Sequence, residues 1–207
     1  MASNSLYSKL DLDFSIRRKE LHILKSNIAQ NDLNMRSALL RSFIPLLYAH
    51  FEGFIKISAS SYLKHINLLR LKNSELNDTF LAYSMNTTSR LSELDRVTKV
   101  INFLRTKHNN RARLSVKKII DTKSNLNAAI FESICVRVGF DWSYYKHKSE
   151  IIDSLVNLRN KIGHGEHNLP DFETVTIYHD EIIVIMGMFK TEIENSCALE
   201  SYKINNH

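Results

Sequence analysis

The sequence has few of the residues that interrupt helices. Only five glycines and two prolines occur among 207 residues. Tight turns and hairpins depend on these residues, so their scarcity argues against many short strands and favours long helices. Apolar residues make up 43% and charged residues 24%, which is ordinary for a globular protein. A chain of this length fits one domain, which we expect to span residues 1–207.

Cysteine is also scarce, because Cys135 and Cys197 are the only two in the chain. Two thiols suit neither a disulfide scaffold nor a structural zinc site. We therefore expect no metal and no cofactor, and a reducing compartment.

Long apolar runs are missing too. The longest, "IIVIMGMF", is too short to span a bilayer, and the opening "MASNSLYSKLDLDF" has no basic segment followed by an apolar core. The sequence thus predicts a soluble, cytoplasmic protein that does not enter the membrane.

Acidic residues are absent from one stretch, "RTKHNNRARLSVKK", between Arg105 and Lys118. Its six Lys and Arg equal the whole formal net charge of +6. Phosphate backbones attract such a patch, so we assign RNA binding to its basic side chains: Arg105, Arg111, Arg113, Lys117 and Lys118. A solvated loop whose charge serves solubility is the competing interpretation.

What the chain does contain is helical periodicity. Apolar residues spaced three, four and seven apart predict helices over about 5–29, 33–67, 91–104, 125–138, 151–162 and 172–199. Pro45 is expected to kink the second helix, Thr87 and Thr88 to cap the third, and Gly139 to end the fourth. Since 174–186 is rich in β-branched residues, a short hairpin there is the alternative. The predicted fold is an all-α bundle of five or six helices.

One stretch stands out chemically, "VNLRNKIGHGEH", from Val156 to His167. Its helix has an apolar stripe of Ile151, Leu155, Leu158 and Ile162, which we expect to face the core. Asn160 and His164 then share one face, one turn apart, and Arg159 lies about 100° to the side. At a helix end followed by Gly165, the dipole favours a protonated imidazole.

Arginine and histidine together suit RNA cleavage without a metal. That reaction needs proton transfers at the 2′-hydroxyl and the leaving 5′-oxygen, which histidine can perform. It also needs extra charge on the phosphorus stabilised, for which the arginine fork is well shaped. One imidazole serves one proton transfer at a time, so a twofold pair of copies would complete the site.

The same residues resemble a known superfamily. "LRNKIGHGE" is similar to the Arg, four to six residues, His motif of HEPN proteins, and "LLYAHFEGFIKISASSYL" to the central helix of stand-alone prokaryotic HEPN families found near restriction and abortive-infection genes. The resemblance implies a homodimer that cleaves RNA without metal, with Arg159 and His164 catalytic and Asn160 orienting. It further implies a toxin or antiviral role, with an antitoxin or neighbouring defence protein as partner. Glu52 matches an acidic position often seen in that branch.

Structural interpretations of these residues remain open. Arg159 could pair with Asp153 or Glu166, and His164 could simply terminate the helix. Glu52 has Lys56 four residues on, an ordinary helical ion pair. The alternative function is therefore a non-catalytic HEPN-like module that binds a protein, a nucleotide or RNA.

Overall fold

The computed structural model describes residues 2–85, 93–120, 125–166 and 170–204. Every regular element in these ranges is helical, and only two isolated β-bridges join extended residues. The α-helices are α1 (Ala2–Gln30), α2 (Leu33–Leu68), α3 (Asp78–Ser84), α4 (Glu93–Lys107), α5 (Val116–Ile119), α6 (Ala128–Arg137), α7 (Ser149–Gly163) and α8 (Phe172–Ala198). Three single 3-10 turns accompany them: η1 (Asn73–Glu75), η2 (Trp142–Tyr144) and η3 (Lys146–Lys148).

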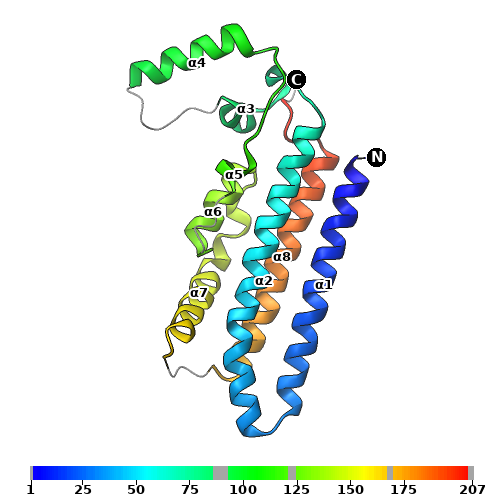
Figure 1. Ribbon diagram of the computed structural model, residues 1–207, viewed down its shortest axis with the longest axis vertical. Coiled ribbons are helices and arrows are strands. Elements are labelled where there is room, and N and C mark those ends of the chain that lie inside the picture. Colours follow the sequence, from blue (N-terminus) through cyan, green and yellow to red (C-terminus); the bar gives the residue numbers. More distant parts are fainter. Residues whose placement is uncertain (1, 86–92, 121–124, 167–169, 205–207) are drawn as a thin grey trace.

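The three longest helices, α1, α2 and α8, lie side by side along the molecule (Figure 1). Two of them begin at a polar cap: at the start of α2 the Asp32 carboxylate accepts from the backbone N–H groups of Asn34 and Met35, and at the start of α8 the Asp171 carboxylate accepts from the N–H of Thr174. These bonds satisfy N–H groups that a helix start leaves without partners. The apolar stripe predicted for α2 is buried along its whole length, from Leu40 to Tyr62.

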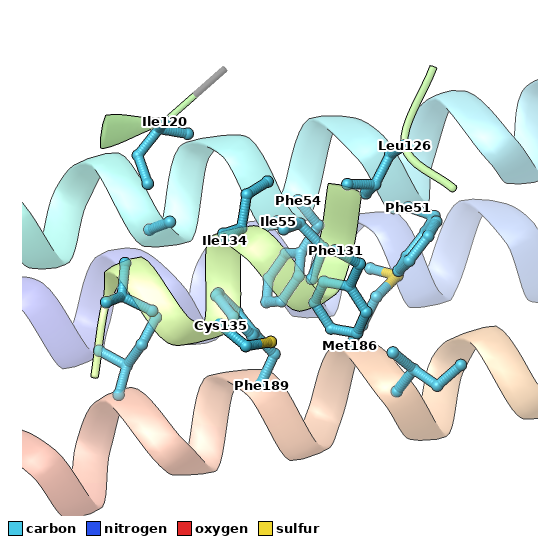
Figure 2. Packing of buried hydrophobic residues seen from close by; sticks show 14 of the residues in the cluster. Phe51, Phe54, Ile55, Ile120, Leu126, Phe131, Ile134, Cys135, Met186 and Phe189 are labelled. Atoms are coloured by element: carbon cyan, nitrogen blue, oxygen red, sulfur yellow. The ribbon is translucent and has the colours of Figure 1, made fainter. Parts of the chain in front are cut away.

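The shorter helices α6 and α7 lie against one side of α2 (Figure 1). Figure 2 shows the aromatic side chains between these layers, with Phe131 of α6 placed close to Phe51 of α2 and Phe189 of α8. Its ring centroid is 5.8 Å from each. Trp142 meets Phe131 edge-on at 5.6 Å and stacks on Tyr145 at 6.0 Å. This packing fixes α6 and the η2 turn onto the long helices.

The structure corrects the expected number of helices, because the described residues contain eight α-helical segments rather than five or six. The additional ones, α3 and α5, have seven and four residues. Segments that short hold too few turns to show a period of 3.6. The hairpin alternative for 174–186 is wrong, since these residues lie inside the unbroken helix α8.

The other helix boundaries agree with the predictions to within a few residues. Gly139 follows α6 with a φ of +79°, the left-handed conformation expected of a terminating glycine. Helix α2 continues without a break through Pro45. The expected caps Thr87 and Thr88 lie outside the described residues.

The core-facing side of α7 is wider than the predicted stripe. Leu155 of the stripe is fully buried, and the other three stripe residues pack half-buried against the core. Ile152 and Val156, which lie outside the stripe, are buried as well. The buried face therefore extends to one side of the stripe, and at 100° per residue this extension runs through Arg159.

Candidate active site

The end of α7 is built as a Schellman motif. The N–H of Glu166 donates to the carbonyl of Lys161 at 3.0 Å, and that of Gly165 to Ile162 at 3.1 Å. Gly165 has a φ of +83°, which an L side chain rarely adopts. Gly163 is the last helical residue and has no positive φ. Of the two glycines, only Gly165 is therefore needed for the turn that carries His164.

Arg41 of α2 holds this turn from outside. Its guanidinium donates to the carbonyl oxygens of Glu166 and Ile162, the latter at 3.4 Å. The Ile162 carbonyl is one of the last four of α7, which have no partner inside the helix, and Glu166 lies just beyond the helix end. A guanidinium there also suits the negative end of the helix dipole. The α7 end is thus fixed to α2 by a charged side chain.

Arg159 occupies a position on the buried face where the helical pattern would place an apolar residue. Its guanidinium carbon lies 4.1 Å from the centroid of the Tyr48 ring, within the range of a cation–π interaction. One of its nitrogens, Nη1, donates to Oδ1 of Asn160 at 2.7 Å. The arginine is half-buried, and these two contacts restrict how its fork can point.

Tyr48 supports Arg159 from α2 and is itself held in place. Its buried hydroxyl accepts a hydrogen bond from the backbone N–H of Leu126. Burial raises the pKa of Tyr48, the Leu126 bond lowers it, and the charge and hydrogen bonding of Glu52 raise it further, against Arg159. Glu52, one helical turn from Tyr48, and Arg159 therefore both act on the Tyr48 hydroxyl, with opposite effects on its pKa.

His164 forms the C-cap of α7, with φ −84° and ψ 5°. Its backbone N–H donates to the Asn160 carbonyl at 2.9 Å, and the residue is exposed. Five residues at 100° each set its position about 140° around the helix from Arg159. Within one copy, Arg159 is directed to α2 and His164 lies on another side.

A comparison with known protein families covers both α2 and α7, the two helices that carry these residues. The sequence profile of the RiboL-PSP-HEPN family matches residues 12–195, which include most of α1, all of α2 and α7, and most of α8. The chain belongs to the RiboL-PSP-HEPN family. No curated protein and no solved structure matches the chain significantly.

In this HEPN protein two site residues were missed by the sequence analysis, Arg41 and Tyr48. Both lie on α2, more than a hundred residues from the motif that they contact. The only sequence signal for Tyr48 is its four-residue spacing from Glu52, which places both residues on one helix face. Asp153, considered as a partner of Arg159, accepts from the N–H of Ala128 and so caps α6.

The basic segment lies far from the motif in this HEPN protein. Arg111 donates to the carbonyl of Asn67 near the end of α2, whereas Arg41 contacts the motif near its start. Arg41 and Asn67 are 26 residues apart on α2, so at about 1.5 Å per residue they are separated by about 39 Å. Figure 1 shows α4 and the end of α7 toward opposite ends of the molecule.

The basic side chains themselves point to solvent. Arg105, Arg111, Arg113 and Lys117 are all exposed, and the side chain of Lys118 lies outside the described part. Within one copy of this HEPN protein, no single phosphate can contact both the basic segment and Arg159.

The described residues contain no cluster of three or more His, Cys, Asp or Glu side chains arranged to hold a metal ion. In the same ranges, no helix combines the length and the apolar character needed to cross a membrane.

Proposed function

We propose that this HEPN protein is an endoribonuclease that cleaves RNA without a metal, at a composite site formed by two copies of the chain. The observation that carries the proposal is the position of Arg159. A charged side chain on the core-facing side of a helix has to be compensated, and here Tyr48 and Asn160 hold it at the helix end beside an exposed histidine.

The angle between Arg159 and His164 supports a composite site. Because the two side chains diverge by about 140° around α7, one copy presents its imidazole away from its own guanidinium. A second copy, related by a twofold axis near the α7 ends, would bring its histidine toward the arginine of the first. Such a pair would supply two imidazoles, one for each proton transfer.

The reaction then proceeds by attack of the 2′-oxygen on the adjacent phosphorus. One His164 accepts the 2′-hydroxyl proton, the bond between phosphorus and the 5′-oxygen breaks, and the other His164 protonates that oxygen. The products are a 2′,3′-cyclic phosphate and a 5′-hydroxyl. Arg159 stabilises the extra negative charge on the phosphate oxygens, and Asn160 orients its guanidinium. A toxin or antiviral role, checked by an antitoxin or neighbouring defence protein, belongs to the same proposal.

The test is cleavage of RNA by purified protein in excess chelator, followed by analysis of the product ends. We expect cyclic phosphate ends from the wild type and a rate at least about 100-fold lower for His164→Ala, because a general acid or base contributes about that factor. Arg159→Lys should lose a similar factor, since an ammonium group has no planar fork.

His147→Ala is the matched control, because His147 is an exposed histidine just before the other end of α7. It should cleave like the wild type. Unchanged cleavage by His164→Ala would refute the assignment. RNA that binds in a salt-sensitive way but stays intact would instead favour a non-catalytic RNA-binding module.

A further inference from the structure

Helix α4 exposes an apolar stripe that the proposed active site does not use. None of the described residues of α4 is buried. Leu94, Val97, Ile101 and Leu104 remain 75%, 50%, 44% and 40% exposed. Single exposed apolar residues are common, but a continuous row on one helix face marks an interaction surface.

The stripe is turned away from the protein body. Asn73 of η1 donates from its side chain to the carbonyl of Lys107 at 2.9 Å, which fixes the C-terminal end of α4. Phe103, one of the two half-buried residues of α4, lines a polar hollow beside this contact. It lies about 140° around the helix from the centre of the stripe. Figure 1 shows α4 standing apart from the long helices.

The spacing within the stripe indicates what could cover it. Its residues are separated by three, four and three positions, the pattern of a coiled-coil seam. A second helix packs naturally on such a seam, with each apolar side chain entering a gap between four residues of the facing helix.

The charges on α4 identify which helix fits. Glu93 and Asp95 lie in the first turn, and Arg105 and Lys107 in the last. A helix that is acidic at one end and basic at the other is complementary to a copy of itself that runs in the opposite direction. The helix dipoles also favour that antiparallel arrangement.

We propose that a second copy of the chain packs on this stripe, with the two α4 helices antiparallel. Leu94 then lies opposite Leu104 of the other copy, and Val97 opposite Ile101. Val100 lies next to the twofold axis, and Glu93 lies beside Lys107 of the other copy. This contact is isologous and is separate from the proposed active-site contact, at the other end of the molecule.

The proposed contact is small. Helix α4 has 15 residues and is about 22 Å long, so the contact falls at the small end of specific interfaces. We therefore expect association in the micromolar range, seen as an increase in mass with concentration.

The test is sedimentation velocity at several concentrations from about 10 to 500 μM, which covers that range. Ile101→Asp should weaken the association about tenfold or more, because pairing would bury a charge. Asn102→Asp is the matched control: it adds the same charge one residue away, on an exposed position outside the stripe, and should associate like the wild type. Equal masses for wild type and Ile101→Asp would overturn the proposal, as would binding of α4 to another protein without self-association.

A charge exchange tests the antiparallel direction. Glu93→Lys and Lys107→Glu should each weaken the association, because like charges would then meet. The double variant should restore it, since opposite charges meet again. If the double variant does not recover, the antiparallel pairing is wrong. RNA cleavage by Ile101→Asp should equal that of the wild type, so the outcome does not depend on the proposed activity.

Discussion

At the scale of single residues, the site depends on how Arg159 is supported. The guanidinium lies over the Tyr48 ring, and the Tyr48 hydroxyl accepts from the backbone of Leu126. The ring and the hydroxyl thus have different tasks, one toward the site and one toward the core. A substitution that removes only the hydroxyl separates them.

We expect Tyr48→Phe to lower the free energy of unfolding by about 1–3 kcal/mol, because the buried N–H of Leu126 loses its acceptor. Urea denaturation measures this change. Tyr144→Phe is the control, since Tyr144 is 58% exposed, and it should leave stability unchanged. The phenylalanine ring still lies under Arg159, so cleavage per folded molecule should remain. A Tyr48→Phe protein as stable as the wild type would contradict the role given to the hydroxyl.

A second residue-scale prediction concerns pH. Burial lowers the pKa of His65, which is 3% exposed and whose Nε2 has no hydrogen-bond partner within the described structure. The unfolded chain, with a histidine pKa of about 6.5, then binds the proton more readily than the folded protein. Stability should therefore be full above pH 6.5 and fall as the pH drops through the lowered folded value.

Urea denaturation at pH 7.5 and 5.5 measures this loss. The loss should be smaller in His65→Gln than in the wild type, whereas His22→Gln, at an exposed position, should retain it. His50 and His179 are lowered by burial as well, so one substitution removes only part of the dependence. An identical loss in His65→Gln and wild type would exclude His65 as a source.

At the scale of elements, the end of α7 offers two glycines with different tasks. Gly165 has positive φ, whereas a Cβ at Gly163 would meet nothing within 4 Å. We expect Gly165→Ala to destabilise the protein by about 1 kcal/mol or more, because the left-handed conformation is costly for an L side chain. Gly163→Ala should be neutral or stabilising by up to about 1 kcal/mol, since alanine favours the helix.

Thermal unfolding of the two variants side by side checks this pair. The two substitutions are chemically identical and two residues apart, so each is the control of the other. Equal effects would show that the turn does not require its left-handed residue.

Most of the helices could be predicted at this scale because their apolar residues repeat over several turns. Two features could not. The buried face of α7 extends beyond the predicted stripe to Ile152 and Val156, and a pattern shows which residues share a face without showing what packs on it. For the same reason, the apolar stripe of α4 correctly predicts a helix, but only the structure shows that the stripe faces solvent. Its exposed residues are Leu94, Val97, Ile101 and Leu104.

The candidate site was predictable only in part. The motif containing Arg159 and His164 is local in sequence, and so is its ending at Gly165. The contacts of Arg41 and Tyr48 join α2 to α7 across more than a hundred residues. Such pairings depend on how the helices pack, which no local pattern contains.

At the scale of the whole molecule, Tyr48, which lies under Arg159, and Asn67, which binds Arg111 of the basic segment, are 19 residues or about 28 Å apart on α2. About eight stacked nucleotides cover that distance at about 3.4 Å each. If the basic segment holds the RNA backbone, it acts on long substrates only.

We therefore expect the triple variant Arg105→Ala, Arg113→Ala and Lys117→Ala to cleave long RNA about tenfold more slowly and to cleave a tetranucleotide like the wild type. Its slope of log affinity against log salt should be shallower by about 2, at about 0.7 for each lost phosphate contact. Replacing Lys9, Lys19 and Lys64, which are exposed elsewhere, removes the same charge and is the control. An equal loss on both substrates would place these side chains at the active site instead.

Trp142 gives the molecule an intrinsic optical reporter. It is the sole tryptophan of the chain, and its indole ring lies against Phe131 and Tyr145, where α6 meets the long helices. Its emission wavelength and quenching depend on that apolar contact, so they change when this junction opens. Unfolding of every variant above can thus be followed by fluorescence, without a dye and without altering a surface that the proposals use.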